Sequence, residues 1–508
     1  MRSHATIVAL VLAVIATAGI LVAPESKSWA DSGDVMFYLG SAETFAHGGG
    51  IRAPIGPWET SGEAGAADSL SVTSHYPPGF SIVLGTVITL GSTPNAAATI
   101  VRAVSLGLTV GITVMLVASI AGALAGALAG IMVMISPFVV FTHTVVFSEP
   151  VFTVFVVATI ALMVMRPDRP LSYGVTAALS LGVRLIGVTL TGAATLWAFS
   201  RPGTLRTRAT RAALAFAPSL VLEAIWLGYV TAHHGGDARH FGWYGPAMPL
   251  MRKLLGINLW WFWPTPDTVH GAWVVAMKGV MLVLFVAVVA RAWRDSRARP
   301  LLTVLGLVFV LYNLVYITDR LVMDWPNNFE LRNFSVTNVL LAIAAATSVG
   351  VVWPKQRALT TAALVAWLGA ATYGSATFLR DAAYETLVYD ATARASSVLS
   401  WVRADPYHRE IYTNWNARVW RVTDRRTRNL PLLFNADTIK ALGAAMTRTH
   451  GVMIGWPSRL PTFSLRPEEM SRYATPDTIA ALLHLPMLVR ARDGIVWGPP
   501  PDSEPAKR

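Results

Sequence analysis

The sequence contains no cysteine and few charged residues. Only 14% of its 508 residues are charged, against about a quarter in an ordinary soluble protein. The absence of cysteine excludes disulfides, thiolate metal sites and cysteine nucleophiles. No Walker loop, dinucleotide-binding glycine pattern, HExxH or GxSxG motif occurs in a plausible context. The sequence therefore gives no sign of the common nucleotide-binding or hydrolytic sites.

Positive charge is present without any motif for nucleic acid. The net charge is +12, but no zinc-finger, RNP or basic-helix pattern accompanies it. In a membrane protein a basic balance usually reflects cytoplasmic loops that face anionic lipid. We therefore expect membrane lipid, and not nucleic acid, as a partner.

Hydrophobic residues make up 54% of the chain and are grouped in long runs. Several runs approach or exceed the ~20 residues that a helix needs to cross the hydrocarbon core. The chain is therefore predicted to be an α-helical polytopic membrane protein. The apolar segments lie near 5–23, 79–92, 96–119, 121–146, 150–165, 171–198, 209–232, 269–291, 300–318, 333–353 and 358–378.

The charge of the links between these segments indicates how the segments are oriented in the membrane. The links at 166–169, 201–211, 291–299 and 355–357 are basic and should all be cytoplasmic. All four links lie on the same side of the membrane under two conditions. The run 171–198 must be a hairpin of two short helices, and 79–92 must not cross. The segment 79–92 is short and begins at the glycine of Pro-Pro-Gly, so we interpret it as interfacial or re-entrant. This predicts about eleven crossings in the plasma (inner) membrane, with the N-terminus cytoplasmic.

The N-terminal segment has two interpretations. Arg2, the apolar run that follows it and Ser28-Trp29-Ala30 resemble a secretory signal with a cleavage site. The run is long for a signal, however, and cleavage would remove the membrane tether of the acidic residues just after it. We favour a retained first helix.

The same topology places several segments together on the external side. These are the first loop, 24–95, with interfacial helices, the Ser148-Glu149-Pro150 turn, and the loops 233–268 and 319–332. Residues 1–378 would form the membrane module and 379–508 a small external α/β domain. In that domain strands are predicted around 410–413 and 451–454, a hairpin at 488–497, and helices beginning at Asn435 and Thr475.

Asp34 is the leading candidate for a catalytic residue. It opens an amphipathic stretch containing Tyr38, which Gly48-Gly49-Gly50 ends. A carboxylate at a helix start is often only an N-cap, and Asp31 is an equal candidate for that cap. A carboxylate where the chain leaves the membrane also suits a substrate whose reactive end lies among the lipid headgroups.

Other external residues are further candidates. His75 and Tyr76 precede the stiff Pro77-Pro78-Gly79 bend, and Glu149 lies at the outer end of a helix. Three arginines, Arg102, Arg184 and Arg332, lie near the external interface, where each can bind a phosphate, extend to the headgroups or pair with a neighbouring acid.

Together these motifs resemble the GT-C superfamily of lipid-linked-sugar glycosyltransferases. The resemblance is to the bacterial branch of the protein O-mannosyltransferases and the lipid A aminoarabinose transferase. It rests on the order of the motifs through residue 350 or so, which run Asp34, Tyr38, Ala42 and Gly48; His75-Tyr76-Pro77-Pro78; Glu149-Pro150; Arg184 and Gly187; and Arg332-Asn333-Phe334. One departure is His75-Tyr76, where the aminoarabinose transferase has a lysine for phosphate.

The resemblance implies a reaction and its partners. A polyprenyl-phosphate-linked sugar would be attacked, with inversion, by a hydroxyl of an acceptor glycan, lipid or protein that Asp34 deprotonates. Arg184, with Arg102 or Arg332, would stabilise the leaving phosphate. Glu149 would position the acceptor or help to bind a divalent cation, a cofactor on which members of the superfamily differ. No metal ligand is assigned.

Three other classes of protein remain as alternatives. Intramembrane charges also mark the substrate pathways of transporters and lipid flippases, but no inverted repeat is evident. An O-antigen-ligase-like enzyme would carry its main external loop late in the chain, whereas here the richest loop is the first. A non-catalytic subunit of an envelope glycan assembly has no sequence feature that separates it from an enzyme.

Overall fold

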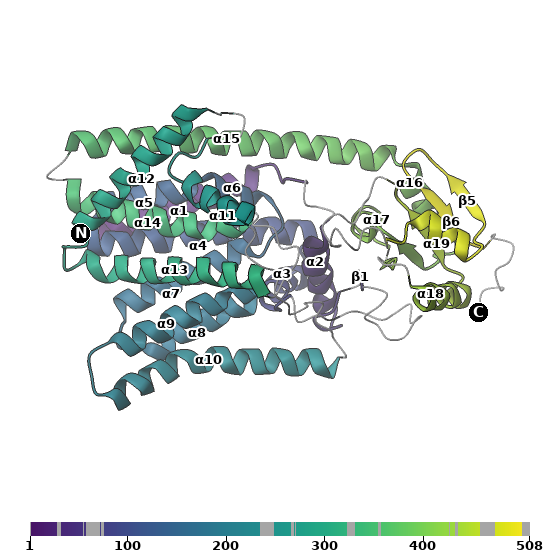
Figure 1. Cartoon of the computed structure of the whole chain (residues 1–508), viewed down its shortest axis with the longest axis horizontal. Coiled ribbons are helices and arrows are strands. Elements are labelled where there is room, and N and C mark those ends of the chain that lie inside the picture. The colour runs from purple at the N-terminus through teal and green to yellow at the C-terminus, as the bar shows by residue number, and fades with distance from the viewer. Residues whose placement is uncertain are drawn as a thin grey trace.

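A large helical part and a smaller part built on a β-sheet make up the molecule (Figure 1). This is a computed structural model. It describes residues 2–27, 32–53, 55–56, 72, 76–233, 248–265, 269, 271–322, 331–353, 357–425, 427–431, 435–457 and 473–499.

Seven helices among the described residues are long and apolar enough to cross a membrane. This confirms the predicted polytopic helical class. Many of their large hydrophobic side chains are exposed on the outside of the bundle, as contact with lipid requires. The seven are α1 (Arg2–Val22), α4 (Pro94–Ala121), α10 (Leu205–Ala232), α12 (Ala272–Ala292), α13 (Ala298–Val322), α14 (Ser335–Val352) and α15 (Arg357–Ala395).

Shorter helices fill the remaining apolar segments. The run 171–198 is the predicted pair of short helices, and 79–92 contains a helix of only 11 residues. The run 121–146 is interrupted, because Pro137 lacks a backbone donor and a second helix begins there at an angle of 54°. The shorter elements are α2 (Gly33–Ala46), α3 (Gly79–Thr89), α5 (Ala123–Met134), α6 (Pro137–Thr144), α7 (Glu149–Met165), α8 (Pro170–Val183), η1 (Leu185–Gly187), α9 (Val188–Ser200), α11 (Met248–Trp260) and η2 (Leu331–Phe334).

The number of crossings stays a prediction. The seven long helices, the bent α5–α6 pair and the short helices α7, α8 and α9 together match the predicted eleven. In that count α3 is the short apolar helix that does not cross. Helices of 13 to 17 residues are shorter than the ~20 that span a bilayer, so α7, α8 and α9 would need a locally thin hydrocarbon layer.

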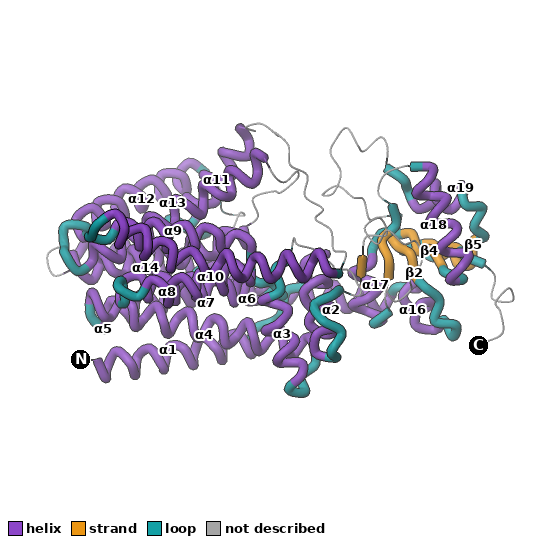
Figure 2. Tube along the Cα trace, turned by 90° about the horizontal axis from the view of Figure 1, so that it is seen from below, coloured by secondary structure: helices purple, strands orange, loops and turns teal. Residues whose placement is uncertain are grey.

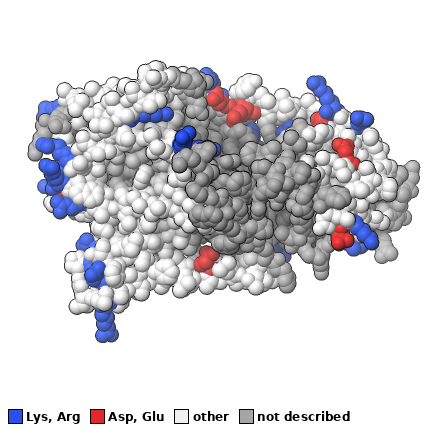
Figure 3. All heavy atoms as spheres, viewed as in Figure 1, with Lys and Arg blue, Asp and Glu red and all other residues white. Residues whose placement is uncertain are grey.

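The two ends of the helical part differ in charge. The N-terminus and the links α7–α8, α9–α10 and α12–α13 lie at one end, and the sheet lies beyond the other (Figures 1 and 2). Figure 3 shows Lys and Arg gathered at the left end, away from the sheet, beside a wide surface without charged residues. These three basic links therefore share one end of the bundle, as the charge pattern predicts, whereas most of the fourth, 355–357, lies outside the described residues.

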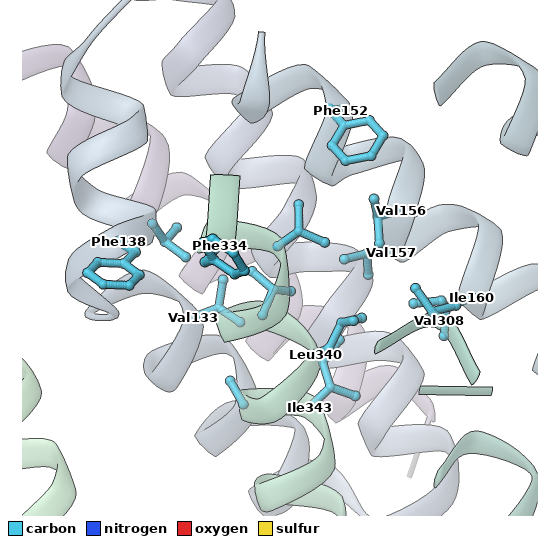
Figure 4. Packing of buried hydrophobic residues seen from close by; sticks show 14 of the residues in the cluster. Val133, Phe138, Phe152, Val156, Val157, Ile160, Val308, Phe334, Leu340 and Ile343 are labelled. Atoms are coloured by element: carbon cyan, nitrogen blue, oxygen red, sulfur yellow. The ribbon is translucent and has the colours of Figure 1, made fainter. Parts of the chain in front are cut away.

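The interior of the bundle is packed with branched and aromatic side chains. Figure 4 shows Phe152, Val156 and Ile160 of α7 near Leu340 and Ile343 of α14, all buried. Helix α14 is enclosed for most of its length and contacts α4, α5, α12 and α13. It therefore gives the residues at its N-terminal end, just after η2, a rigid support.

The C-terminal part contains the predicted strands, the predicted hairpin and the predicted caps. Asn435 and Thr475 cap α18 and α19 through their side chains, and β5 and β6 form the hairpin. The elements are α16 (Ser397–Ala404), β2 (Ile411–Thr413), α17 (Asn416–Thr423), β3 (Thr427–Asn429), α18 (Ala436–Thr449), β4 (Val452–Gly455), α19 (Pro476–Leu482), β5 (Met487–Arg490) and β6 (Ile495–Trp497).

The sheet also contains a strand from the first external loop, which the sequence analysis did not anticipate. Its order is β1-β3-β2-β4-β6-β5, and β1 (Ile55–Gly56) pairs in parallel with β3. The strands β3, β2 and β4 are parallel, whereas β6 and β5 are antiparallel. Helix α15 runs without a break through residue 378, so the sheet part is joined to the bundle by a continuous helix as well as by β1.

A cluster of charges joins the two parts just after the C-terminal end of α1. The Glu25 carboxylate lies 3.2 Å from Arg102 of α4, 3.1 Å from Lys27 and 3.5 Å from Arg421 of α17. Burial by itself raises the pKa of the Glu25 carboxyl, but Arg102, Lys27 and Arg421 together hold the pKa below its ordinary value. The side chain of Thr386 in α15 also donates to the Glu25 carbonyl. We call Glu25, Lys27, Arg102 and Arg421 the junction cluster.

Replacing Glu25 by Gln is expected to destabilise the protein. The variant leaves Arg102, which is only 2% exposed, without its charged partner. Removing one partner of a buried pair costs about 3–5 kcal/mol, and we expect roughly 2 kcal/mol here because the Glu25 side chain is partly exposed. The effect is measured as a lower Tm in detergent. Asp381→Asn, in an exposed pair with Arg380, is the control and should change stability by less than about 0.5 kcal/mol. Equal Tm values for the two variants would contradict the structural role of Glu25.

Candidate functional site

Asp34 lies in the first turn of α2, the helix of the first external loop. The cap of this helix is Ser32, whose hydroxyl accepts from the Val35 amide at 3.3 Å. The interpretation of Asp34 or Asp31 as the N-cap is therefore wrong, because Ser32 already fills that position. A carboxylate in a first turn is also stabilised by the helix dipole. Asp34 keeps its side chain 24% exposed and directs its oxygens at other elements.

Tyr76 brings the second half of the first loop onto Asp34. Its phenol donates to Asp34 Oδ1 at 2.7 Å. The ring stacks on Phe37 at 4.5 Å and meets the edge of Tyr38 at 5.3 Å. Burial, together with the Asp34 charge, raises the pKa of Tyr76 well above its ordinary value, so the phenol stays protonated and keeps donating. Of the other predicted residues in this loop, Asp31 and His75 lie outside the described residues.

Arg332 bonds to the other oxygen of Asp34, although it is 298 positions away in sequence. It lies in η2, directly before α14, and its guanidinium lies 4.4 Å from the centre of the Phe147 ring. Its Nε is 3.9 Å from Glu149 Oε1. Arg332 therefore lies between two carboxylates and forms its closer contact with Asp34.

Glu149 is the most buried charge of the group. It begins α7 and is 1% exposed, and its Oε2 lies 2.8 Å from Nη1 of Arg184. A buried carboxylate is tolerated when a cation and a helix N-terminus compensate for lost hydration. Glu149 has such cations close by and lies at the N-terminus of α7. Its two carboxylate oxygens face Arg184 and Arg332.

Arg184 is fixed by several partners at the break between α8 and α9. Its Nη1 also donates to Ser148 Oγ at 2.9 Å, and its Nη2 donates to Asn333 Oδ1 at 3.2 Å. Ser148 in turn donates to the Tyr38 hydroxyl at 3.2 Å. Burial raises the pKa of Tyr38 to about 12, so this hydroxyl also stays protonated. Arg184 is therefore linked to the Asp34 helix through Ser148 and Tyr38.

The break that carries Arg184 depends on Gly187. The backbone at Arg184 is extended, with φ −149° and ψ 135°, and the 3-10 turn η1 follows it. A Cβ on Gly187 would lie 2.4 Å from the Leu181 backbone nitrogen, closer than side chains are ever found. Only glycine lets η1 pack this tightly against α8. The glycine that follows Arg184 three positions later is therefore required for steric reasons.

These contacts bring together most, but not all, of the predicted residues. The site cluster consists of Asp34, Tyr38, Tyr76, Glu149, Arg184 and Arg332, all from the prediction, together with Ser148 and Asn333. Arg102 is not part of it, since its guanidinium belongs to the junction cluster. The sequence analysis missed Phe147, because an aromatic residue within an apolar run carries no signal of its own.

No group of three or more His, Asp or Glu side chains suited to a metal ion occurs in the described part of the chain. Of the predicted external loop 233–268, residues 234–247 lie outside it, and these include His234, Asp237 and His240. The Glu149 oxygens, a candidate for holding a divalent cation, already face two arginines. Glu149 is therefore engaged with cationic side chains in this structure.

Comparisons with known proteins identify the fold. No family model matches the sequence, and no curated protein matches it. Two solved structures of ArnT from Cupriavidus metallidurans, one bound to undecaprenyl phosphate and one apo, match 97% of this chain and 97% of theirs. Their TM-scores are 0.56 and 0.55 at 13% and 14% identity. An Archaeoglobus fulgidus oligosaccharyltransferase, in a complex with Zn and sulfate, matches with a TM-score of 0.50 at 12% identity, over 89% of this chain and 67% of its own. The chain thus has the GT-C fold that the sequence motifs predict.

The steric role of Gly187 can be tested with a matched glycine. Gly187→Ala should destabilise the protein by about 2 kcal/mol, because the added methyl group collides with backbone that cannot move away easily. Gly192→Ala, in the following helix, places its Cβ 3.6 Å from Leu311 Cδ1, an ordinary contact. It should be neutral or stabilise α9 by up to about 1 kcal/mol. Thermal unfolding in detergent compares the two, and an undiminished Tm for Gly187→Ala would remove the steric argument.

Proposed function

We propose that this chain is an inverting membrane glycosyltransferase that moves a sugar from a polyprenyl-phosphate donor to an acceptor hydroxyl. The observation that carries the proposal is the convergence of two carboxylates and two arginines at one site. Figure 1 shows α2 and α3 between the long helices and the sheet, which is where a lipid headgroup would lie. A likeness in fold to ArnT, solved with undecaprenyl phosphate, adds support for this donor class.

Asp34 is the general base in this proposal. It takes the proton of the acceptor hydroxyl while the acceptor oxygen attacks the anomeric carbon. The bond from that carbon to the phosphate oxygen breaks as the new glycosidic bond forms on the opposite face, which inverts the configuration. Asp34 is preferred to Glu149 for this role because Glu149 is buried and Asp34 is partly exposed.

Arg184 and Arg332 stabilise the leaving group. The donor phosphate carries one negative charge as a diester and gains a second as it leaves, so fixed cations favour the transition state over the bound donor. The Arg184 guanidinium is held by two hydrogen bonds and an ion pair on several elements, which reduces its reorganisation during the reaction. Glu149 acts as a positioning residue that keeps both arginines in place.

Tyr76 and Tyr38 orient the base and one of the arginines. Tyr76 donates to Asp34 and leaves the carboxylate able to accept the proton of the acceptor. Tyr38 links the same helix to Arg184 through Ser148. Asp31 and His75 are retained as candidate substrate contacts because they adjoin Ser32 and Tyr76 in sequence. Arg102 would contribute only through the junction cluster.

The orientation in the membrane belongs to the same proposal. With the basic links cytoplasmic, the N-terminus is also cytoplasmic, and the site cluster and residues 379–508 are external. Residues 1–378 then form the membrane module and 379–508 a domain that covers the external site. The acceptor, whether glycan, lipid or protein, would enter between them.

Replacing Asp34 by Asn should abolish sugar transfer. The change removes the base but keeps the size of the side chain, so kcat is expected to fall by about 10²–10⁴-fold with little change in Tm. The measurement is transfer by the purified variant from a polyprenyl-phosphate sugar donor to the acceptor. Asp381→Asn, which changes an exposed carboxylate outside the site cluster, is the control and should retain activity. Full activity of Asp34→Asn would remove this residue from the mechanism, and a flippase would keep moving lipid in both variants.

The orientation can be tested with reporter fusions. A periplasmically active reporter fused after residue 400 should be active, and the same reporter fused in the link 291–299 should be inactive. The reason is that basic links are retained in the cytoplasm during insertion. A cytoplasmic position for residue 400 would invert the whole topology and place the site cluster on the wrong side for an external acceptor.

A further inference from the structure

Both oxygens of the proposed base are already engaged in this structure. Asp34 Oδ1 accepts from Tyr76 at 2.7 Å, and Asp34 Oδ2 is bonded to Arg332. A general base must present an oxygen to the proton that it removes. A bound guanidinium also stabilises the charged carboxylate and so makes it a weaker base. Asp34 is therefore held in an arrangement that does not suit catalysis.

The two arginines are held very differently. Arg184 has a hydrogen bond to Ser148, another to Asn333 and an ion pair with Glu149 at 2.8 Å. Arg332 bonds closely to Asp34, while Glu149 lies farther from it, at 3.9 Å. Arg332 also lies in a 3-10 turn of four residues, and its side chain is about as exposed as that of Arg184, at 14% against 17%. Of the two cations, Arg332 is the one that can exchange its partner without breaking the support of a buried charge.

The charges of the cluster explain when such an exchange would occur. Asp34 and Glu149 balance Arg184 and Arg332, so the cluster is neutral before an anion arrives. A phosphate that enters adds negative charge and competes with the carboxylates for the same guanidinium groups. Arginine binds phosphate and carboxylate with the same planar fork of N–H donors. A phosphate can therefore take the place of the Asp34 carboxylate on Arg332 and accept the same kind of hydrogen bonds.

We propose that the donor phosphate and Asp34 compete for Arg332, so that arrival of the donor frees Asp34 to act as the base. The inference rests on the proposed function and adds an order of events to it. The base becomes free only when the donor is in place. After transfer, the leaving phosphate, now with two negative charges, keeps Arg332 until it departs, and Asp34 loses its proton before the ion pair forms again.

A double-mutant cycle on lipid phosphate binding tests this competition. The probe is undecaprenyl phosphate, titrated into the full-length protein in detergent, and the readout is its Kd. Asp34→Asn removes the competitor without changing the shape, so it should tighten binding by about 10-fold, the size of a modest ion pair. Arg332→Gln should weaken binding, and adding Asp34→Asn to that variant should no longer tighten it.

The second background separates competition from a general field effect. Removal of any nearby negative charge helps an anion to bind, but that effect persists when Arg332 is absent. Equal tightening in both backgrounds, or no tightening at all, would overturn the inference while leaving the proposed function intact. Failure of every variant, and of the wild type, to bind undecaprenyl phosphate would overturn the proposed function itself.

A second substitution keeps the test valid if Arg332→Gln does not fold. Arg332→Lys retains the charge but loses the fork that binds two oxygens at once. Asp34→Asn should then tighten binding clearly less in the Arg332→Lys background than in the wild type. Asp381→Asn, an exposed carboxylate paired with Arg380, serves as the control and should leave the Kd unchanged.

Discussion

The burial of one carboxylate, Glu149, is the constraint on which the rest of the site depends. A charge that is removed from water must be compensated by a cation held close to it, or the fold loses several kcal/mol. Arg184 provides that charge from the break between two helices, and Arg332 contributes from a turn before another helix. Neither place is α-helical, since the backbone at Arg184 is extended and Arg332 lies in a 3-10 turn. Because Arg332 is placed by Glu149, it is also close enough to pair with Asp34.

The first external loop depends equally on the C-terminal part. Strand β1 of this loop is an edge of the sheet, and Ala417 and Trp420 of α17 belong to the same buried core as α2. The junction cluster adds an electrostatic contact at the start of the loop, where Arg421 reaches Glu25. The geometry around Asp34 is therefore set by two parts of the chain that are far apart in sequence. The sheet part helps to build the site rather than merely covering it.

Local features of the site were readable in the sequence because they rest on local chemistry. The spacing of Asp34 and Tyr38, the short helix after Pro77-Pro78-Gly79 and the helix break near Gly187 all appear as predicted. Errors arose where two local rules competed. The N-cap of α2 is Ser32 and not Asp31 or Asp34. Serine, aspartate and asparagine are nearly equivalent as N-caps, so the residue type could not decide among them. The short strand β1 was not predicted, because the strand that it pairs with lies more than 370 residues away in the sequence.

The sequence by itself determined the membrane class, the grouping of three basic links at one end of the bundle and most of the residues that the structure brings together in the site cluster. These follow from hydrophobic length, charge and helix-breaking residues, which act within a few turns of chain. Only the tertiary structure decided the partners. Arg102 and Arg332 look alike in sequence, yet one pairs with Glu25 at the junction and the other with Asp34. The physical reason is that an ion pair forms within about 4 Å, and the packing of whole helices decides which charges come that close.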